Sequence, residues 1–155
     1  MWKRCVGCLL GGLAAVIFAA TLLCASLLKD PFFLSSSAIG DGAETIAHEY
    51  YLYDKSSCAS IRSELSFLDL PAVRGESVSL RFKTERDAVA YMDALLTRSG
   101  ASVVDIESSG GAESVYAYAA GYGEGLRLFD ACVNLQIARR GAYVCVGSPI
   151  IFGGY

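Results

Sequence analysis

A run of 24 residues without a charge or a proline, residues 5–28, constrains this chain of 155 residues more than any other feature. A helix of roughly 20 apolar residues spans a bilayer core of about 30 Å, so the run is long enough to cross a membrane. Lys3 and Arg4 precede the run, and a positive flank of this kind stays in the cytoplasm. A cleaved signal peptide is the alternative, although its apolar core is usually about 7–15 residues. The sequence therefore predicts an extracytoplasmic protein, either anchored through residues 5–28 with a cytoplasmic N-terminus or secreted after cleavage.

Composition divides the rest of the chain into a tether and one domain. Residues 30–42 combine Pro31, a serine triplet and two glycines, which is typical of a linker. We therefore expect an anchor or signal segment in residues 1–29, a linker in residues 30–42 and a single extracytoplasmic domain in residues 43–155.

The charge of the predicted domain opposes nucleic-acid binding. From Asp30 onward the chain has 10 Lys or Arg against 16 Asp or Glu, a formal charge of −6. Nucleic acids are bound through clustered cationic side chains, and no basic stripe interrupts the acidic balance. Three cysteines follow the apolar run, namely Cys58, Cys132 and Cys145. Three buried thiols are the simplest interpretation, and a disulfide from Cys58 to either of the others stays open.

The middle of the domain has the clearest secondary-structure signals. In residues 76–83 apolar and polar side chains alternate, which is the period of a half-buried strand. Thr84 then stands as an N-cap before a helix over residues 85–98, and Gly100 follows in the usual C-terminal position. Its expected buried face is Ala88, Tyr91, Met92, Leu95 and Leu96.

Antiparallel strands follow the helix. Gly110 and Gly111 predict a tight turn between strands near residues 101–108 and 113–120. Residues 121–125 are expected to form a loop, and their glycines do not have the spacing of a phosphate-binding site. A second hairpin is expected to turn at Arg140–Gly141, so that Ile137 opposes Val144 and one face is apolar. Upstream, residues 43–54 fit a helix or a strand, and residues 58–71 favour a helix that stops at Pro71. The expected fold is α+β, an antiparallel sheet backed by one or two helices.

The C-terminal 22 residues resemble the YwmB family, envelope-associated proteins of spore-forming Gram-positive bacteria. The matching residues are Asn134, Leu135, Gln136, Ala138, Arg139, Tyr143, Gly147, Pro149, Ile150, Ile151 and Tyr155. The resemblance implies a sheet and helices arranged as in the TATA-binding protein, and a role at the cell envelope in wall synthesis or sporulation. It carries over no established activity.

Few residues are candidates for chemistry. His48 is the only histidine, so a site with two histidine ligands is impossible, and the scattered carboxylates predict no metal or cofactor site. A thiolate–imidazole pair of Cys58 and His48, oriented by Asp54, is the enzymatic alternative, a small cysteine hydrolase. We expect no enzyme, and instead a binding or structural protein whose partner is an envelope protein or a cell-wall component.

Polar and tyrosine side chains are the candidates for the partner surface. Tyrosine provides a large contact area at a low cost in entropy and is enriched at interfaces, and the alternation of the last hairpin puts polar residues on the face opposite the apolar one. Those polar residues could equally hydrogen-bond neighbouring backbone or face water. The candidate residues are Asn134, Gln136, Tyr143, Tyr116, Tyr118 and Tyr122.

Overall fold

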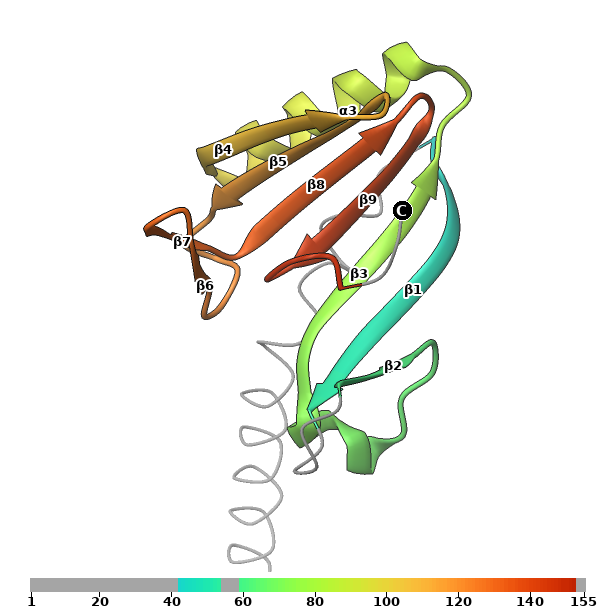
Figure 1. The fold of residues 1–155 in the computed structure, drawn as a ribbon. Helices are drawn as coiled ribbons and strands as arrows, with labels where there is room; N and C mark the ends of the chain where they lie inside the picture. Colours follow the sequence, from blue (N-terminus) through green and yellow to red (C-terminus); the bar gives the residue numbers. More distant parts are fainter. Residues whose placement is uncertain (1–41, 54–58, 153–155) are drawn as a thin grey trace, which may run out of the picture. The chain divides into compact units, whose positions relative to one another are not determined.

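The computed structural model describes residues 42–53 and 59–152, and they form an α+β domain. A seven-stranded antiparallel sheet carries one α-helix on one of its faces, as Figure 1 shows, and a two-stranded ribbon, β6–β7, lies at one end. The strand order in the sheet is β2-β1-β3-β9-β8-β5-β4. The predicted class, an antiparallel sheet backed by a helix, is confirmed. The elements are β1 (Glu44–Tyr53), β2 (Ala59–Arg62), the 3-10 helix η1 (Phe67–Ala72), β3 (Val73–Arg81), α3 (Glu85–Ser99), β4 (Ser102–Ser109), β5 (Ala112–Tyr118), β6 (Leu126–Leu128), β7 (Ala131–Val133), β8 (Leu135–Arg140) and β9 (Tyr143–Ser148).

Helix α3 begins where the sequence predicts and ends one residue later, at Ser99 before Gly100. The Thr84 hydroxyl accepts a hydrogen bond from the backbone N–H of Asp87 at 3.1 Å, which satisfies one of the N–H groups left free in the first turn. Gly100 ends the helix in the left-handed conformation, with φ of 60°, where a residue without a side chain is least strained.

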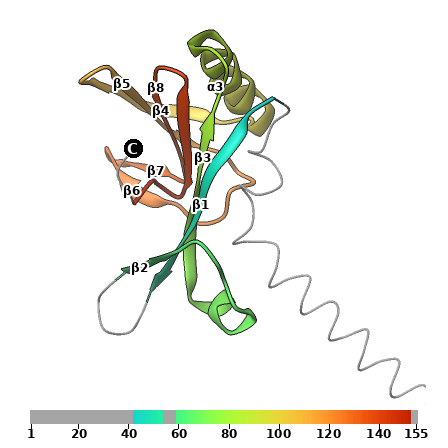
Figure 2. The ribbon, with the colours of Figure 1, turned by 90° about the vertical axis from the view of Figure 1, so that its right-hand side faces the viewer.

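The core lies between α3 and the face of the sheet that it covers, here called the inner face (Figure 2). Four of the five residues predicted for the buried face of the helix are buried, and the fifth, Leu96, packs partly buried against the same cluster. The sheet contributes alternate residues of β3, β9, β8 and β5. These strand residues are Val78, Leu80, Val144, Val146, Leu135, Ile137, Val115 and Ala117.

Both predicted hairpins form, but the second has a different register. Ile137 pairs with Val146, and Gly141 and Ala142 make the turn. The predicted turn at Arg140–Gly141 was therefore one residue early. Gly141, with φ of 58°, takes the first central position of a two-residue turn, where hairpins favour glycine. The shift exchanges Val144 for Val146 opposite Ile137, and both lie on the inner face, so the predicted apolar face is unchanged.

The first part of the domain departs from the prediction. Residues 44–53, which fit a helix or a strand, are a strand, β1. The helix favoured for residues 58–71 was wrong, because β2 pairs with β1 and only the 3-10 helix η1 follows, with Pro71 inside it. Pairing with β1 supplies backbone partners that a weak helical pattern cannot match.

The predicted anchor and nearly all of the predicted linker lie outside the described residues. Among the residues that the structure describes, no helix is both long and apolar enough to span a bilayer.

Candidate functional site

The face of the sheet opposite α3, here called the outer face, carries a row of small side chains across five strands. Ser114 of β5 pairs with Ala138 of β8, which pairs with Cys145 of β9, then Ser79 of β3 and Ala47 of β1. Alternation puts all five side chains on the same face. The neighbouring row toward the β8–β9 turn has the larger side chains of Arg81, Tyr143 and Arg140.

A small cavity opens on this row. It has a volume of about 200 Å³ and is lined mostly by apolar atoms, which is below the roughly 300–1,000 Å³ of typical small-molecule sites. It therefore suits one side chain of a partner better than a cofactor. The lining residues are Ser79, Leu80, Ala138, Arg140, Tyr143, Val144 and Cys145.

The Cys145 thiol in this lining is a poor nucleophile. It is buried, and the Ser79 hydroxyl donates a hydrogen bond to its sulfur at 3.5 Å. Burial raises the pKa of the Cys145 thiol, and the hydrogen bond from Ser79 opposes that shift without cancelling it. Cys132 and Cys145 are both free thiols, and Cys132 is exposed, so the expectation that it is buried was wrong.

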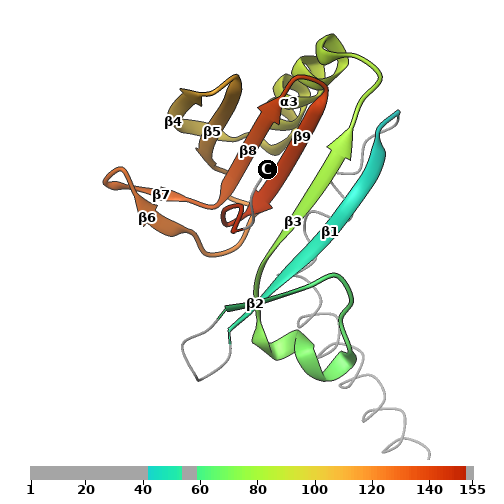
Figure 3. The same ribbon diagram turned by 45° about the vertical axis from the view of Figure 1, so that its right-hand side comes forward.

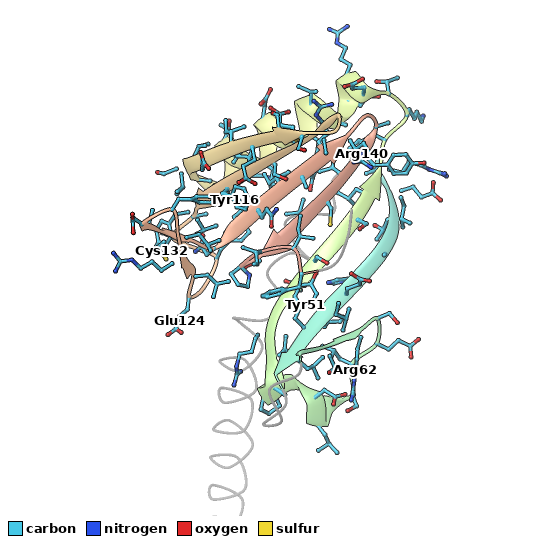
Figure 4. The ribbon with its side chains drawn as sticks, in the orientation of Figure 1. Tyr51, Arg62, Tyr116, Glu124, Cys132 and Arg140 are labelled. Atoms are coloured by element: carbon cyan, nitrogen blue, oxygen red, sulfur yellow. The ribbon has the colours of Figure 1, made fainter. Side chains whose placement is uncertain are left out.

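The rim of the cavity at the β8–β9 turn is aromatic and cationic. Tyr143 is 52% exposed, and beside it Arg81 pairs with Glu44 across the ends of β3 and β1. That carboxylate, followed by Tyr143, raises the pKa of the Arg81 guanidinium. Arg140 is exposed, and no carboxylate of the described residues forms an ion pair with it. Figure 4 shows Arg140 at this rim and Tyr116 further along the same face.

Tyr116, Tyr118 and Phe129 form an aromatic cluster at the other end of the outer face. The β6–β7 ribbon meets β5 there, as the backbone in Figure 3 shows. The rings of Tyr116 and Phe129 meet edge to face with centroids 5.0 Å apart, and the Tyr116 hydroxyl donates to Glu107 Oε2 at 3.0 Å. Phe129 is 50% exposed and Tyr118 is 40% exposed. Tyr118 and Phe129 thus present ring surface to solvent, and Tyr116 is half-buried beside Phe129.

The backbone at Phe129 is held in an unusual conformation. Phe129 and Asp130 form the two-residue turn between β6 and β7, with φ of 51° and 59°. The left-handed region costs a residue with a side chain about 1–2 kcal/mol, and asparagine or glycine is the usual choice there. Sequence reasoning missed Phe129 because phenylalanine is not a turn residue. The short alternation of Leu126 and Leu128 before it was the available signal.

Three of the six predicted partner-surface residues are buried in the fold. Asn134 is fully buried: its Oδ1 accepts from the N–H of Ala119 at 2.8 Å, and its Nδ2 donates to the carbonyls of Ala119 and Gly123. Gln136 is 4% exposed, and its Oε1 accepts from the N–H of Ile151. Asn134 and Gln136 therefore hydrogen-bond backbone groups, which was the alternative to a partner surface in the sequence analysis. Tyr122 lies in the core. Tyr116, Tyr118 and Tyr143 remain at the surface of the outer face.

Residues 149–152, here called the C-terminal strap, cross the outer face beside the row of small side chains. Ile151 bonds Gln136, and the N–H of Phe152 donates to the Tyr51 hydroxyl at 3.2 Å. Gly147 permits this close crossing, since a Cβ there would lie 2.6 Å from the backbone of Ile150 and Ile151. The strap and the aromatic rim therefore bound the row of small side chains on opposite sides.

The structure gives no distances for the cysteine–histidine pair of the hydrolase alternative, because Cys58 and Asp54 lie outside the described residues. His48 is on β1, on the inner face, with Nε2 2.8 Å from Glu76 Oε2 and Nδ1 3.3 Å from the Tyr50 hydroxyl. Desolvation and then the Glu76 charge raise the pKa of Tyr50. No group of three metal-ligating side chains occurs in residues 42–53 and 59–152.

Comparisons with known proteins identified no relative. No protein-family model matches the chain, no curated protein matches it, and no solved structure matches it.

Proposed function

We propose that the chain is a binding or structural protein of the cell envelope, anchored through residues 5–28 with its domain outside the membrane, and that the outer face of the sheet is its binding surface. We include in this proposal a relationship to the YwmB family, which the matching C-terminal residues support. We also include an arrangement of sheet and helices like that of the TATA-binding protein, which the antiparallel sheet with α3 on one face supports. Cell-wall synthesis or sporulation is the proposed setting.

The aromatic cluster of Tyr116, Tyr118 and Phe129 is the observation that carries this proposal. Aromatic residues are enriched in the cores of protein interfaces. A half-exposed phenylalanine in a left-handed turn gains little for the fold, because asparagine would make the same turn with less strain. Strain that persists at an exposed side chain points to a role for that side chain outside the fold.

The chemistry of the face favours an envelope protein as the partner over a wall polymer. From Asp30 onward the chain has a formal charge of −6, which repels anionic polymers. The cavity on the row of small side chains has the size and apolar lining to take one apolar side chain, and anchoring side chains of this kind dominate the energy of protein interfaces.

A native-complex experiment with Phe129→Asn tests the proposal. The full chain is expressed from its own locus, and membranes are solubilised and resolved by native electrophoresis. The substitution relieves the left-handed strain and loses the ring contact with Tyr116, so the free energy of unfolding should change by less than about 1 kcal/mol. We expect the wild-type chain in a complex larger than itself and the variant shifted out of it.

Val89→Asn is the matched control, because Val89 is a 40% exposed apolar residue of α3, on the other side of the sheet. It should leave the complex intact. A complex that survives Phe129→Asn, or that both substitutions disrupt equally, contradicts the proposal. A second assay mixes the chain with purified cell-wall sacculi and sediments them. If the wild-type chain co-sediments and the Phe129 variant does not, the partner is the cell wall and not a protein.

A further inference from the structure

The outer edge of β4 is an open strand edge. β4 pairs with β5 on one side, and no other described strand pairs with it on the other. At the opposite end of the sheet, β2 covers part of the edge of β1. Most residues of β4 are exposed along its eight-residue length. A long exposed edge of this kind is a template for another strand.

The side chains of β4 differ sharply between its two faces. Val103 and Ile106 lie on the inner-face side, opposite Ala117 and Val115, and are 48% and 54% exposed. Asp105 and Glu107 lie on the outer-face side. The edge therefore presents two β-branched apolar side chains on one face and two carboxylates on the other.

The backbone groups that point outward can be assigned from the hairpin. Ser109 pairs with Ala112 around the two-residue turn at Gly110–Gly111, so these two residues share both hydrogen bonds. Bonded and non-bonded pairs alternate along an antiparallel ladder. Ser108 and Ile106 therefore direct their N–H and C=O groups away from β5, toward the open edge.

A second copy of β4 fits this edge poorly. An antiparallel copy that bonds through the outward groups can centre on Ile106, which sets Asp105 opposite Glu107. It can also pair Ile106 with Ser108, which sets Glu107 opposite Glu107. Like charges directly opposite are destabilising. Both registers that use the apolar residues therefore oppose self-association.

We propose that β4 accepts an extended segment of another protein as an additional antiparallel strand, one in which Lys or Arg alternates with apolar residues. Its cationic side chains lie over Asp105 and Glu107, and its apolar side chains cover Val103 and Ile106. Backbone bonds to Ile106 and Ser108 hold the segment. The edge adjoins the outer face, since Tyr116 bonds Glu107, but the inference is carried by the outward backbone groups of β4 and does not depend on the proposed function.

Binding of a defined peptide to the full chain in neutral detergent tests the inference. The probe is acetyl-Lys-Val-Lys-Val-Lys-Val-Lys-amide with a fluorescent label, followed by anisotropy. The critical variant is Ser108→Pro, which removes an outward N–H, keeps the ladder to β5 and changes no charge. Its control is Ser108→Ala. A cationic peptide that bound only through the acidic charge of the domain would not distinguish the two variants.

We expect Ser108→Pro to weaken binding by at least about ten-fold and Ser108→Ala to leave it within about two-fold. Asp105→Asn should also weaken binding, more at low salt than at high salt. Equal binding by Ser108→Pro, or no binding of the probe at about 1 mM, would overturn the inference. If Ser108→Pro does not fold, a second probe tests the inference on the wild-type chain. This probe is the same peptide with N-methyl groups at alternate residues, so it keeps every charge but cannot donate backbone hydrogen bonds to the β4 edge. Equal binding of that probe would also overturn it.

Discussion

Replacing Asn134 with alanine should destabilise the domain strongly without acting on a partner. Asn134 is fully buried between β7 and β8, and its amide makes three hydrogen bonds, to the N–H and carbonyl of Ala119 and to the carbonyl of Gly123. These bonds hold the segment that leaves β5 against the start of β8. An alanine leaves the buried N–H of Ala119 without its partner and removes one bond each from the carbonyls of Ala119 and Gly123. The Ala119 carbonyl keeps the hydrogen bond from the N–H of Tyr122, and Gly123 is exposed.

The expected cost follows from the three lost hydrogen bonds. The buried N–H of Ala119 that loses its partner costs about 1–3 kcal/mol, and each lost bond to a carbonyl adds about 0.5–1.5 kcal/mol, which gives a total of about 3 kcal/mol. For a domain of this size the midpoint of thermal unfolding should fall by about 10–20 °C. Gln136→Ala, which removes the bond from the N–H of Ile151 in the strap, should cost only about 1 kcal/mol.

Chemical and thermal unfolding followed by circular dichroism measures both variants. The reasoning fails if Asn134→Ala unfolds within about 0.5 kcal/mol of the wild type, or if it loses the native complex while its stability is unchanged. Either result would return Asn134 to the partner surface that the sequence suggested.

Three further predictions concern the strap, the core and the cavity. Gly147→Ala should displace the strap, cost about 1–3 kcal/mol and speed amide exchange at Ile151, and unchanged exchange at Ile151 would contradict the close crossing. Burial raises the pKa of the Tyr91 hydroxyl above its ordinary value of 10.0, so the unfolded state loses that proton first and stability should fall as pH rises above about 10. Tyr91→Phe should flatten this fall, and equal slopes in thermal unfolding between pH 9 and 11 would refute the assignment. The raised pKa of Cys145 predicts slow alkylation at neutral pH that accelerates in alkaline solution, as mass spectrometry can follow, whereas rapid labelling at neutral pH would contradict a buried thiol.

The parts of the fold that the sequence predicted are those with dense local signals. The helix after Thr84 has a cap, an apolar face and a terminal glycine, and the turn at Gly110 has two glycines between alternating runs, so each needs only neighbouring residues to specify it. Residues 58–71 lack such signals. Pairing of β2 with β1, which depends on residues distant in the sequence, decides their structure.

The candidate site shows the same limit. Alternation alone puts Gln136 and Tyr143 on the outer face, but whether a polar side chain there meets solvent or backbone depends on the strap, which returns across the sheet to bond Gln136. Asn134 lies between two strands, so its bonds to Ala119 could not be read from the period of either one. Phe129 is recognised only from a backbone conformation that its residue type disfavours.

Photo-crosslinking in living cells is the most direct test of the outer face as the binding surface. Benzoylphenylalanine replaces Tyr118 on the outer face in one strain and Val89 on α3 in another, and both positions are 40% exposed. The account predicts one defined protein adduct from position 118 and none from position 89, with the adduct lost when Phe129→Asn is added. The same adducts from both positions, or an adduct from position 89 alone, would contradict it.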